Sequence, residues 1–216
     1  MIGLAGDLLA TPGPLGEIVV PGEGLGGRYV EVAPYQFRKQ GHQETLVFET
    51  DDGGRVTRAF IGSLPVMVAD RLSFWETAQA HQLVIGLALV SAFFLLLNAI
   101  RNRGQVTAAG AVRMGRLGLQ GAAVSYLLFT VGMVVIFSRV EVNDMIFHFP
   151  PPGTGLLLVL PLVGGAFTLL SVGMLPPVWR SAGTSIWQRL RYTWTSVIFL
   201  LLLGVLGYWN LLGWRY

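Results

Sequence analysis

Apolar and polar residues follow two different patterns along this chain. Between residues 28 and 61 they alternate, which is typical of β-strands with one buried face. Beyond residue 81, four stretches of 19 to 23 residues contain no charged residue: 82–100, 117–138, 153–175 and 192–214. A helix of about 20 residues crosses the hydrocarbon core of a bilayer. The pattern predicts a membrane α-helical bundle of four transmembrane helices, preceded by a small antiparallel β domain.

The third apolar stretch is the least regular of the four. It contains Pro161 and several glycines, and a proline inside a helix removes a backbone hydrogen bond. We expect Pro161 to bend this span. The alternative is a three-span protein in which 153–175 enters the membrane and leaves on the same side.

The N-terminal region has the composition of a small β domain. Three segments are the clearest predicted strands: 28–33, 44–50 and 55–61. The sequence Asp51-Asp-Gly-Gly54 predicts a hairpin turn between the last two. Residues 35–43 add a strand and a turn, whereas 1–27 are rich in Gly and Pro apart from the apolar run 17–20. These strands are too few to close a barrel, so we expect an open sheet edge.

The predicted domain organisation follows from these patterns. Residues 1–66 form the small extracytoplasmic β domain, residues 67–80 a short juxtamembrane helix, and residues 81–216 the four-helix transmembrane domain.

Charge is distributed very unevenly between the two regions. Only 12% of the 216 residues are charged, against about 25% in an ordinary soluble domain. Residues 1–78 carry six basic and ten acidic residues, a net charge of −4, whereas 79–216 carry nine Arg and two acids, a net charge of +7. The basic residues lie between apolar stretches rather than along one polar face, so we expect no nucleic-acid partner.

The arginines predict the orientation of the bundle. Seven fall in two predicted loops: Arg101, Arg103, Arg113 and Arg116 in the first, and Arg180, Arg189 and Arg191 in the second. The loop after the second span and the C-terminal tail have one arginine each, Arg139 and Arg215. Because basic loops stay in the cytoplasm, we expect both Arg-rich loops there. The N-terminal domain and the C-terminus are then extracytoplasmic, in the plasma (inner) membrane of a bacterium.

The first residues do not resemble a signal peptide. They lack a basic segment, and Asp7, Pro12 and Pro14 interrupt the apolar run. An extracytoplasmic domain of this size needs help to cross the membrane. We expect the chain to be the C-terminal piece of a longer exported protein. The alternative is that the first span acts as a reverse signal-anchor.

Candidate chemistry is sparse. The chain has no cysteine, which excludes disulfides, thiolate metal sites and cysteine nucleophiles. His42 and Glu44 match the letters H-x-E of zinc deaminases without the partner cysteines. His81 and His148 are expected at the outer interface without a third ligand, and Ser125 with His148 is a weak match to an intramembrane protease. We therefore predict no catalytic, cofactor-binding or metal site.

Inside the spans, the informative residues are small or polar. No Asp, Glu, Lys or Arg lies within a predicted span, which argues against an ion or proton pathway. Asn98 and Asn210 lie near span ends, where we expect interhelical hydrogen bonds or headgroup contacts. The pairs Gly118/Ala122 and Gly121/Ser125 predict close helix packing within the bundle. The arginines of the first loop could contact anionic lipid headgroups, although topology alone accounts for them.

Two segments carry a resemblance to a known family. Tyr35-Gln-Phe-Arg38 and Leu46-Val-Phe-Glu-Thr-Asp-Asp-Gly-Gly-Arg-Val-Thr57 resemble the small β domain that follows the catalytic domain in serine hydrolases of the β-lactamase family (class C β-lactamases and penicillin-binding-protein relatives). Some members of that family continue into a multi-span membrane region. Asp70-Arg-Leu-Ser-Phe-Trp-Glu76 is similar to the junction. The resemblance covers nearly the whole chain, as the tail of such a protein.

The catalytic motifs of that family are missing from this chain. The nucleophile motif is S-x-x-K, but the only lysine is Lys39 and position 36 is Gln. A Y-x-N sequence occurs as Tyr208-Trp-Asn210, inside the fourth span. The resemblance therefore implies a membrane-anchoring and accessory C-terminal module, non-catalytic by itself, with the lipid bilayer and a serine hydrolase catalytic domain as partners. The alternative is a self-standing small multi-pass membrane protein that binds a partner or ligand through its β domain.

Overall fold

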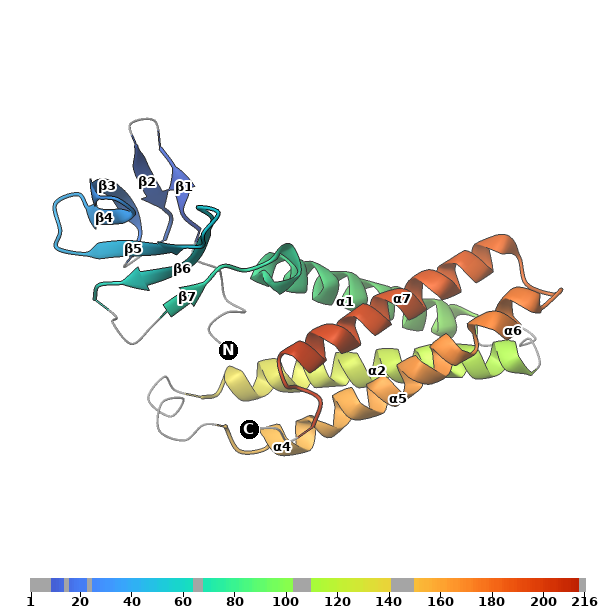
Figure 1. Ribbon diagram of the computed structural model, residues 1–216. Coiled ribbons are helices and arrows are strands. Elements are labelled where there is room, and N and C mark those ends of the chain that lie inside the picture. Colours follow the sequence, from blue (N-terminus) through green and yellow to red (C-terminus); the bar gives the residue numbers. More distant parts are fainter. Residues whose placement is uncertain are drawn as a thin grey trace. The chain divides into compact units, whose positions relative to one another are not determined.

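The structure is a computed structural model that describes residues 9–13, 16–22, 25–63, 68–102, 110–140 and 150–213. The chain divides into two compact units, residues 1–81 and 82–216. The first unit contains a sheet and the second contains helices (Figure 1). Each is described by itself.

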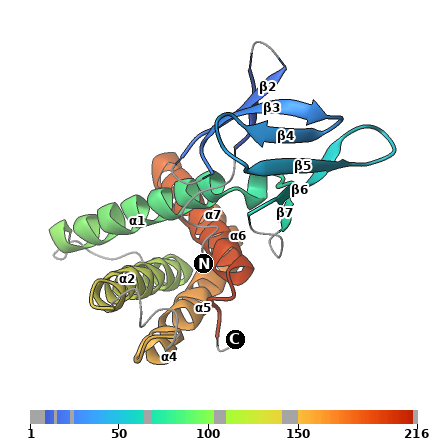
Figure 2. The ribbon, with the colours of Figure 1, turned by 90° about the vertical axis from the view of Figure 1, so that its left-hand side faces the viewer.

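The first unit is a seven-stranded antiparallel sheet with strands in chain order. The strands are β1 (Thr11–Pro12), β2 (Glu17–Val20), β3 (Gly27–Ala33), β4 (Gln36–Lys39), β5 (Thr45–Thr50), β6 (Val56–Ile61) and β7 (Val68–Asp70). The sheet is curved and open, as Figure 2 shows. The predicted strands at 28–33, 44–50 and 55–61 are confirmed as β3, β5 and β6, and the strand expected within 35–43 is β4.

Local chemistry explains the hairpin between β5 and β6. The Asp51 carboxylate accepts hydrogen bonds from the backbone N–H groups of Gly53 (2.9 Å) and Arg55 (2.8 Å). Gly54 has φ of +74°, a conformation that costs glycine little. The predicted turn is thus confirmed.

One face of the sheet forms a small core. Tyr29 and Leu46 are fully buried, and Val20 and Ile61 pack with them. The Tyr29 hydroxyl donates to the Leu25 carbonyl at 2.7 Å, so its polar end is satisfied. Phe37 and Phe48 extend this face with their rings 5.6 Å apart, edge to face.

The helix expected over 67–80 is wrong for most of its length. Residues Val68–Asp70 form β7, which pairs with β6, and a 3-10 turn (Phe74–Glu76) follows. The α-helix begins only at Ala78. Pairing of Val68 with Phe60 and of Asp70 with Arg58 gives this segment a strand partner, and the sequence of 67–80 alone did not reveal that pairing.

The second unit contains four helical segments long and apolar enough to cross a membrane, as the sequence predicted. They are α1 (Ala78–Arg101), α2 (Ala111–Phe137), the segment Thr154–Arg180, and α7 (Ile186–Tyr208). Length and composition define these candidate spans. The fold is therefore an antiparallel sheet followed by four helices compatible with a multi-pass membrane protein.

The third candidate span consists of three consecutive helices, α4 (Thr154–Leu157), α5 (Val159–Gly173) and α6 (Leu175–Arg180). Pro161 lacks the N–H that would bond the carbonyl of Leu157, which accounts for the break at Leu158. Pro176 and Pro177 account in the same way for the break at Met174. The predicted bend thus lies at Leu158, three residues before Pro161. The segment is nevertheless long and apolar enough to cross a membrane by itself.

Close packing between α2 and α5 forms the centre of the bundle. A Cβ added at Gly118 would lie 3.1 Å from the Phe167 carbonyl oxygen, and one added at Gly121 would lie 2.7 Å from the Phe167 ring. Tyr126 crosses over Gly164 and its hydroxyl lies 2.9 Å from the Thr168 hydroxyl. The prediction that small residues of the second span pack within the bundle is confirmed.

The structure extends the second and fourth predicted spans toward their N-termini. The charge-free stretches begin at 117 and 192, whereas α2 begins at Ala111 and α7 at Ile186. Ser185 and Gln188 cap α7 reciprocally, with both hydrogen bonds at 3.3 Å. At the other end, Asn210 has φ of +54° and the Leu211 N–H bonds the Leu206 carbonyl at 2.8 Å, which ends α7 before the predicted 214.

Candidate functional site

A polar cavity of about 390 Å³ lies between α1, α2 and α7, at the end of the bundle where α2 and α7 begin. Its polar lining consists of Asn98, Asn102, Arg113, Arg116, Gln120, Thr184, Gln188, Arg191, Tyr192 and Thr195. Apolar side chains of α1, α2 and α6 close the remaining wall. The volume lies within the range of about 300–1,000 Å³ that is usual for small-molecule sites.

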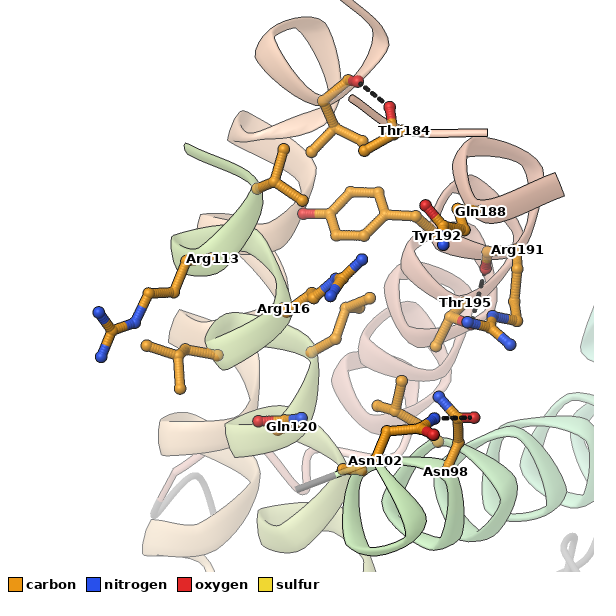
Figure 3. A pocket seen from close by; sticks show the side chains of 16 residues that line it. Asn98, Asn102, Arg113, Arg116, Gln120, Thr184, Gln188, Arg191, Tyr192 and Thr195 are labelled. Atoms are coloured by element: carbon orange, nitrogen blue, oxygen red, sulfur yellow. Dashed lines mark hydrogen bonds between the residues drawn. The ribbon is translucent and has the colours of Figure 1, made fainter. Parts of the chain in front are cut away.

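The arginines of the wall point in different directions (Figure 3). Arg116 is half-buried and extends from α2 toward α7, into the cavity. Arg113, one turn earlier on α2, is exposed and points away from it. Arg191 is exposed on α7 and also borders a second hollow between α1 and α7.

Several polar groups of the wall are already engaged within the bundle. The Tyr192 hydroxyl donates to the Ser171 carbonyl at 2.6 Å, and the Thr195 hydroxyl donates to the Arg191 carbonyl at 2.9 Å. Asn102 donates to the Asn98 side-chain oxygen at 2.9 Å. These bonds hold the wall in place.

Other groups have no partner among the described residues. The guanidinium groups of Arg116 and Arg191 and the amide of Gln120 form no hydrogen bond or ion pair with any residue of the described ranges. By contrast, Arg189 donates to the Thr184 hydroxyl (3.0 Å) and the Ser181 carbonyl (2.7 Å), a structural role. The cavity therefore contains both a fixed framework and uncommitted donors.

The electrostatics of this end of the bundle favour a negative charge. A helix N-terminus carries a partial positive charge and normally attracts acidic side chains. Neither α2 nor α7 has an acidic residue in its first turn, and both carry arginines there or just beyond. The helical unit has two acidic residues in its sequence, Glu141 and Asp144, which follow the opposite end of α2. From Arg116 to that end the helix runs about 30 Å.

The outer face of the sheet is the second notable surface. Arg58 forms ion pairs with Asp70 (3.0 Å) and Glu49 (3.8 Å) across three strands. Beside this ladder, Val47, Phe60 and Val68 are cross-strand partners, and the last two are exposed. Val30 and Val32 on β3 are exposed as well. An apolar sheet face of this kind marks a contact surface more often than a scattered exposed side chain does.

The histidine and serine candidates that the structure describes lie on three different elements. His42 lies in the turn before β5, and His81 is buried in the first turn of α1. Ser125 is buried on α2, while its expected partner His148 lies outside the described residues. Within the described ranges, no group of three or more His, Asp or Glu side chains could hold a metal ion.

For the two asparagines the structure shows local contacts in place of the expected interhelical hydrogen bonds, and the expected headgroup contacts stay a prediction. Asn98 lines the cavity and bonds Asn102 of the same chain segment, not a neighbouring helix. Asn210 caps α7 through its backbone conformation. The charge pattern places Arg113, Arg116 and Arg191 in loops, so the sequence alone does not reveal the cavity. The capping signal Ser185-x-x-Gln188 could have placed Arg191 on a helix.

Comparison of the chain with protein-family models, curated proteins and solved structures found no match.

Proposed function

We propose that the chain is a membrane-anchoring and accessory module of a serine hydrolase of the β-lactamase family, with no catalytic role of its own. The observation that carries the proposal is the direct connection of a compact antiparallel sheet to four helices of membrane-spanning length. In this proposal the bundle lies in the plasma membrane and keeps the sheet at its outer surface. The sheet contacts the catalytic domain.

The positions of the family-like segments support this proposal. Residues 35–38 and 46–57 fall on β4, β5 and β6, which are neighbours in the sheet. The resemblance therefore describes one continuous part of the sheet. The exposed Val30, Phe60 and Val68 offer a surface on which a second domain can bury apolar area.

The alternative, a self-standing membrane protein that binds a separate partner through the sheet, relies on the same exposed face. Binding of a partner by addition of a further strand to the sheet edge receives less support from the structure, because both edge strands are short. The edge strand β1 has two residues, one of them Pro12, and the edge strand β7 has three, ending at Asp70. Short edges with proline and charge resist the pairing of a further strand.

Orientation can be tested by single-cysteine labelling, since the chain has no native cysteine. We expect Asp52→Cys, in the β5–β6 turn, to react with a membrane-impermeant maleimide in intact bacteria. We expect Gly183→Cys, in the turn before α7, to react only after lysis. The cysteine-free chain is the control. Labelling of Gly183→Cys alone in intact cells would contradict the extracytoplasmic position of the sheet.

The link to a hydrolase can be tested independently of orientation. Sequencing the genomic DNA upstream of the Met1 codon is expected to show an open reading frame that encodes an S-x-x-K domain in frame. An in-frame stop codon next to a ribosome-binding site, with no hydrolase gene adjacent, would contradict the hydrolase proposal. It would leave the alternative partner-binding function.

A further inference from the structure

The polar cavity of the helical unit has the properties of an anion site. We propose that the cavity between α1, α2 and α7 binds a phosphate-bearing anion, the phosphodiester headgroup of a lipid or a soluble phosphate compound, with Arg116 as its main ligand. This inference goes beyond the anchoring function. It concerns helices of the second unit only.

The first argument is the uncompensated charge of Arg116. Its guanidinium is half-buried, points into the cavity and has no ion-pair partner among the described residues. Removing a charge from water costs free energy unless a counter-charge or hydrogen bonds replace the hydration. An anion in the cavity supplies both, because a guanidinium can bond two phosphate oxygens at once.

The second argument is the direction of the helix dipoles. Both α2 and α7 begin beside the cavity, so their N-terminal partial positive charges add to those of Arg116 and Arg191. These four positive contributions repel one another when the cavity holds only water. A bound anion is attracted to all four and offsets their mutual repulsion, and neither first turn has an acidic residue that would do so.

The third argument is the remaining lining. Gln120 and Asn98 have amide groups with free donors, because the Asn102 bond uses only the oxygen of Asn98. Such donors suit the hydroxyl and ester oxygens that accompany a phosphate in a glycerol headgroup. A volume of about 390 Å³ exceeds what a bare phosphate needs. It lies at the small end of the usual range for organic ligands.

The position of the cavity makes a lipid accessible. It lies at the ends of apolar helices, where headgroups are located, and α1 borders it with an exposed apolar surface. Only 17% of the apolar stretch of α1 is buried inside the molecule, against 44% for α7. Acyl chains can therefore lie along α1 while the headgroup occupies the cavity.

The test uses the full chain, purified in detergent and incubated with a defined mixture of phosphatidylglycerol and phosphatidylcholine. Native mass spectrometry measures which lipid stays bound. We expect preferential retention of one phosphatidylglycerol. R116Q should weaken this retention about tenfold or more, since it removes a charge-assisted hydrogen bond. R191Q, at an exposed position, should weaken it in the same direction.

Two matched controls separate a site from general attraction. R139Q removes the same charge just beyond the opposite end of α2, where Arg139 is exposed and does not line the cavity. R180Q removes the same charge from α6, outside the cavity. Both should retain the lipid as the unchanged chain does. Equal losses in all four variants, or no loss in R116Q and R191Q, would overturn the proposal.

A second arm distinguishes the two sources of phosphate. Inorganic phosphate is titrated against the chain in phosphatidylcholine alone, with thermal unfolding as the readout. Stabilisation by phosphate that R116Q abolishes and R139Q keeps, without lipid retention, assigns the site to a soluble compound. Retention of phosphatidylglycerol without a phosphate effect assigns it to lipid. If neither probe acts on the unchanged chain, the cavity is not an anion site.

Discussion

Single glycines determine how closely the helices of the bundle approach one another. Gly164 on α5 leaves room for the Tyr126 ring of α2, and that ring in turn packs edge to face on Phe199 at 5.5 Å. The absence of a side chain at Gly164 therefore lets α2, α5 and α7 pack together at this point. In a membrane, where apolar surface gains little from leaving lipid, such close contacts supply much of the association energy.

Substituting Gly164 tests this contact. A Cβ at this position would lie 2.7 Å from the Tyr126 ring, so Gly164→Leu should destabilise the bundle by about 1–3 kcal/mol through overpacking. Gly204→Leu on α7 is the control, because nothing lies within 4 Å of its Cβ position. Denaturant unfolding in detergent measures both. Equal stability of the two variants would show that α2 and α5 do not pack this tightly.

At the scale of elements, the strands and helices differ in how far sequence determined them. Alternation and the Asp51 turn predicted β3 to β6 because each carries its own pattern. β1 has two residues and β7 has three, which is too short for an alternating pattern to be recognised in the sequence. Both are strands because they form hydrogen bonds with their neighbours, β2 and β6.

The helices were predicted as spans but not at their ends. Charge was used as the boundary, although an arginine within the first turns of a helix can reach the headgroup region. Charge as a boundary places Arg116 and Arg191 in loops, and it therefore does not reveal the cavity between their helices. A cavity lined by residues of three different helices cannot be recognised from the spacing of those residues along the sequence.

A hydrogen bond between the residues that flank β5 and β6 predicts that the stability of the sheet depends on pH. Glu44, just before β5, accepts a hydrogen bond from the Ser63 N–H at 2.9 Å, just after β6. The hydrogen bonds from Ser63 lower the pKa of Glu44 below its ordinary value. A carboxyl group with a lowered pKa stabilises the folded state at pH values above its unfolded pKa of about 4.3. This stabilisation is lost as the pH falls through the pKa of the folded state.

We therefore expect Glu44→Gln to lower the unfolding temperature at pH 7, and we expect the difference to shrink as the pH falls below about 4.3. Thermal unfolding followed by circular dichroism across this range measures the difference between the two chains. A difference that stays constant with pH would mean that the ionised carboxylate contributes nothing.

At the scale of the whole molecule, the chain combines two units with different sources of stability. The sheet depends on a small core around Tyr29 and Leu46. The helical unit depends on packing among α2, α5 and α7, with apolar side chains exposed on its outside. Each unit has its own core, so we expect each to unfold separately.

Leu46→Ala tests this independence. Leu46 is fully buried, and its truncation should cost the sheet about 2–5 kcal/mol. Calorimetry of the full chain in detergent should then show one transition at a lower temperature and a second one unchanged. The exposed Val32→Ala on β3 serves as the control. A shift of both transitions in Leu46→Ala would show that the units unfold together.

The arginines at one end of the bundle have an electrical consequence. Six of them lie at the ends of α1, α2, α6 and α7 that meet there: Arg101, Arg113, Arg116, Arg180, Arg189 and Arg191. Turning the bundle over would carry each through the membrane voltage at about 2.3 kcal/mol per 100 mV, or about 14 kcal/mol for all six. In an energised membrane that is negative on the arginine side, the voltage itself holds the inserted orientation.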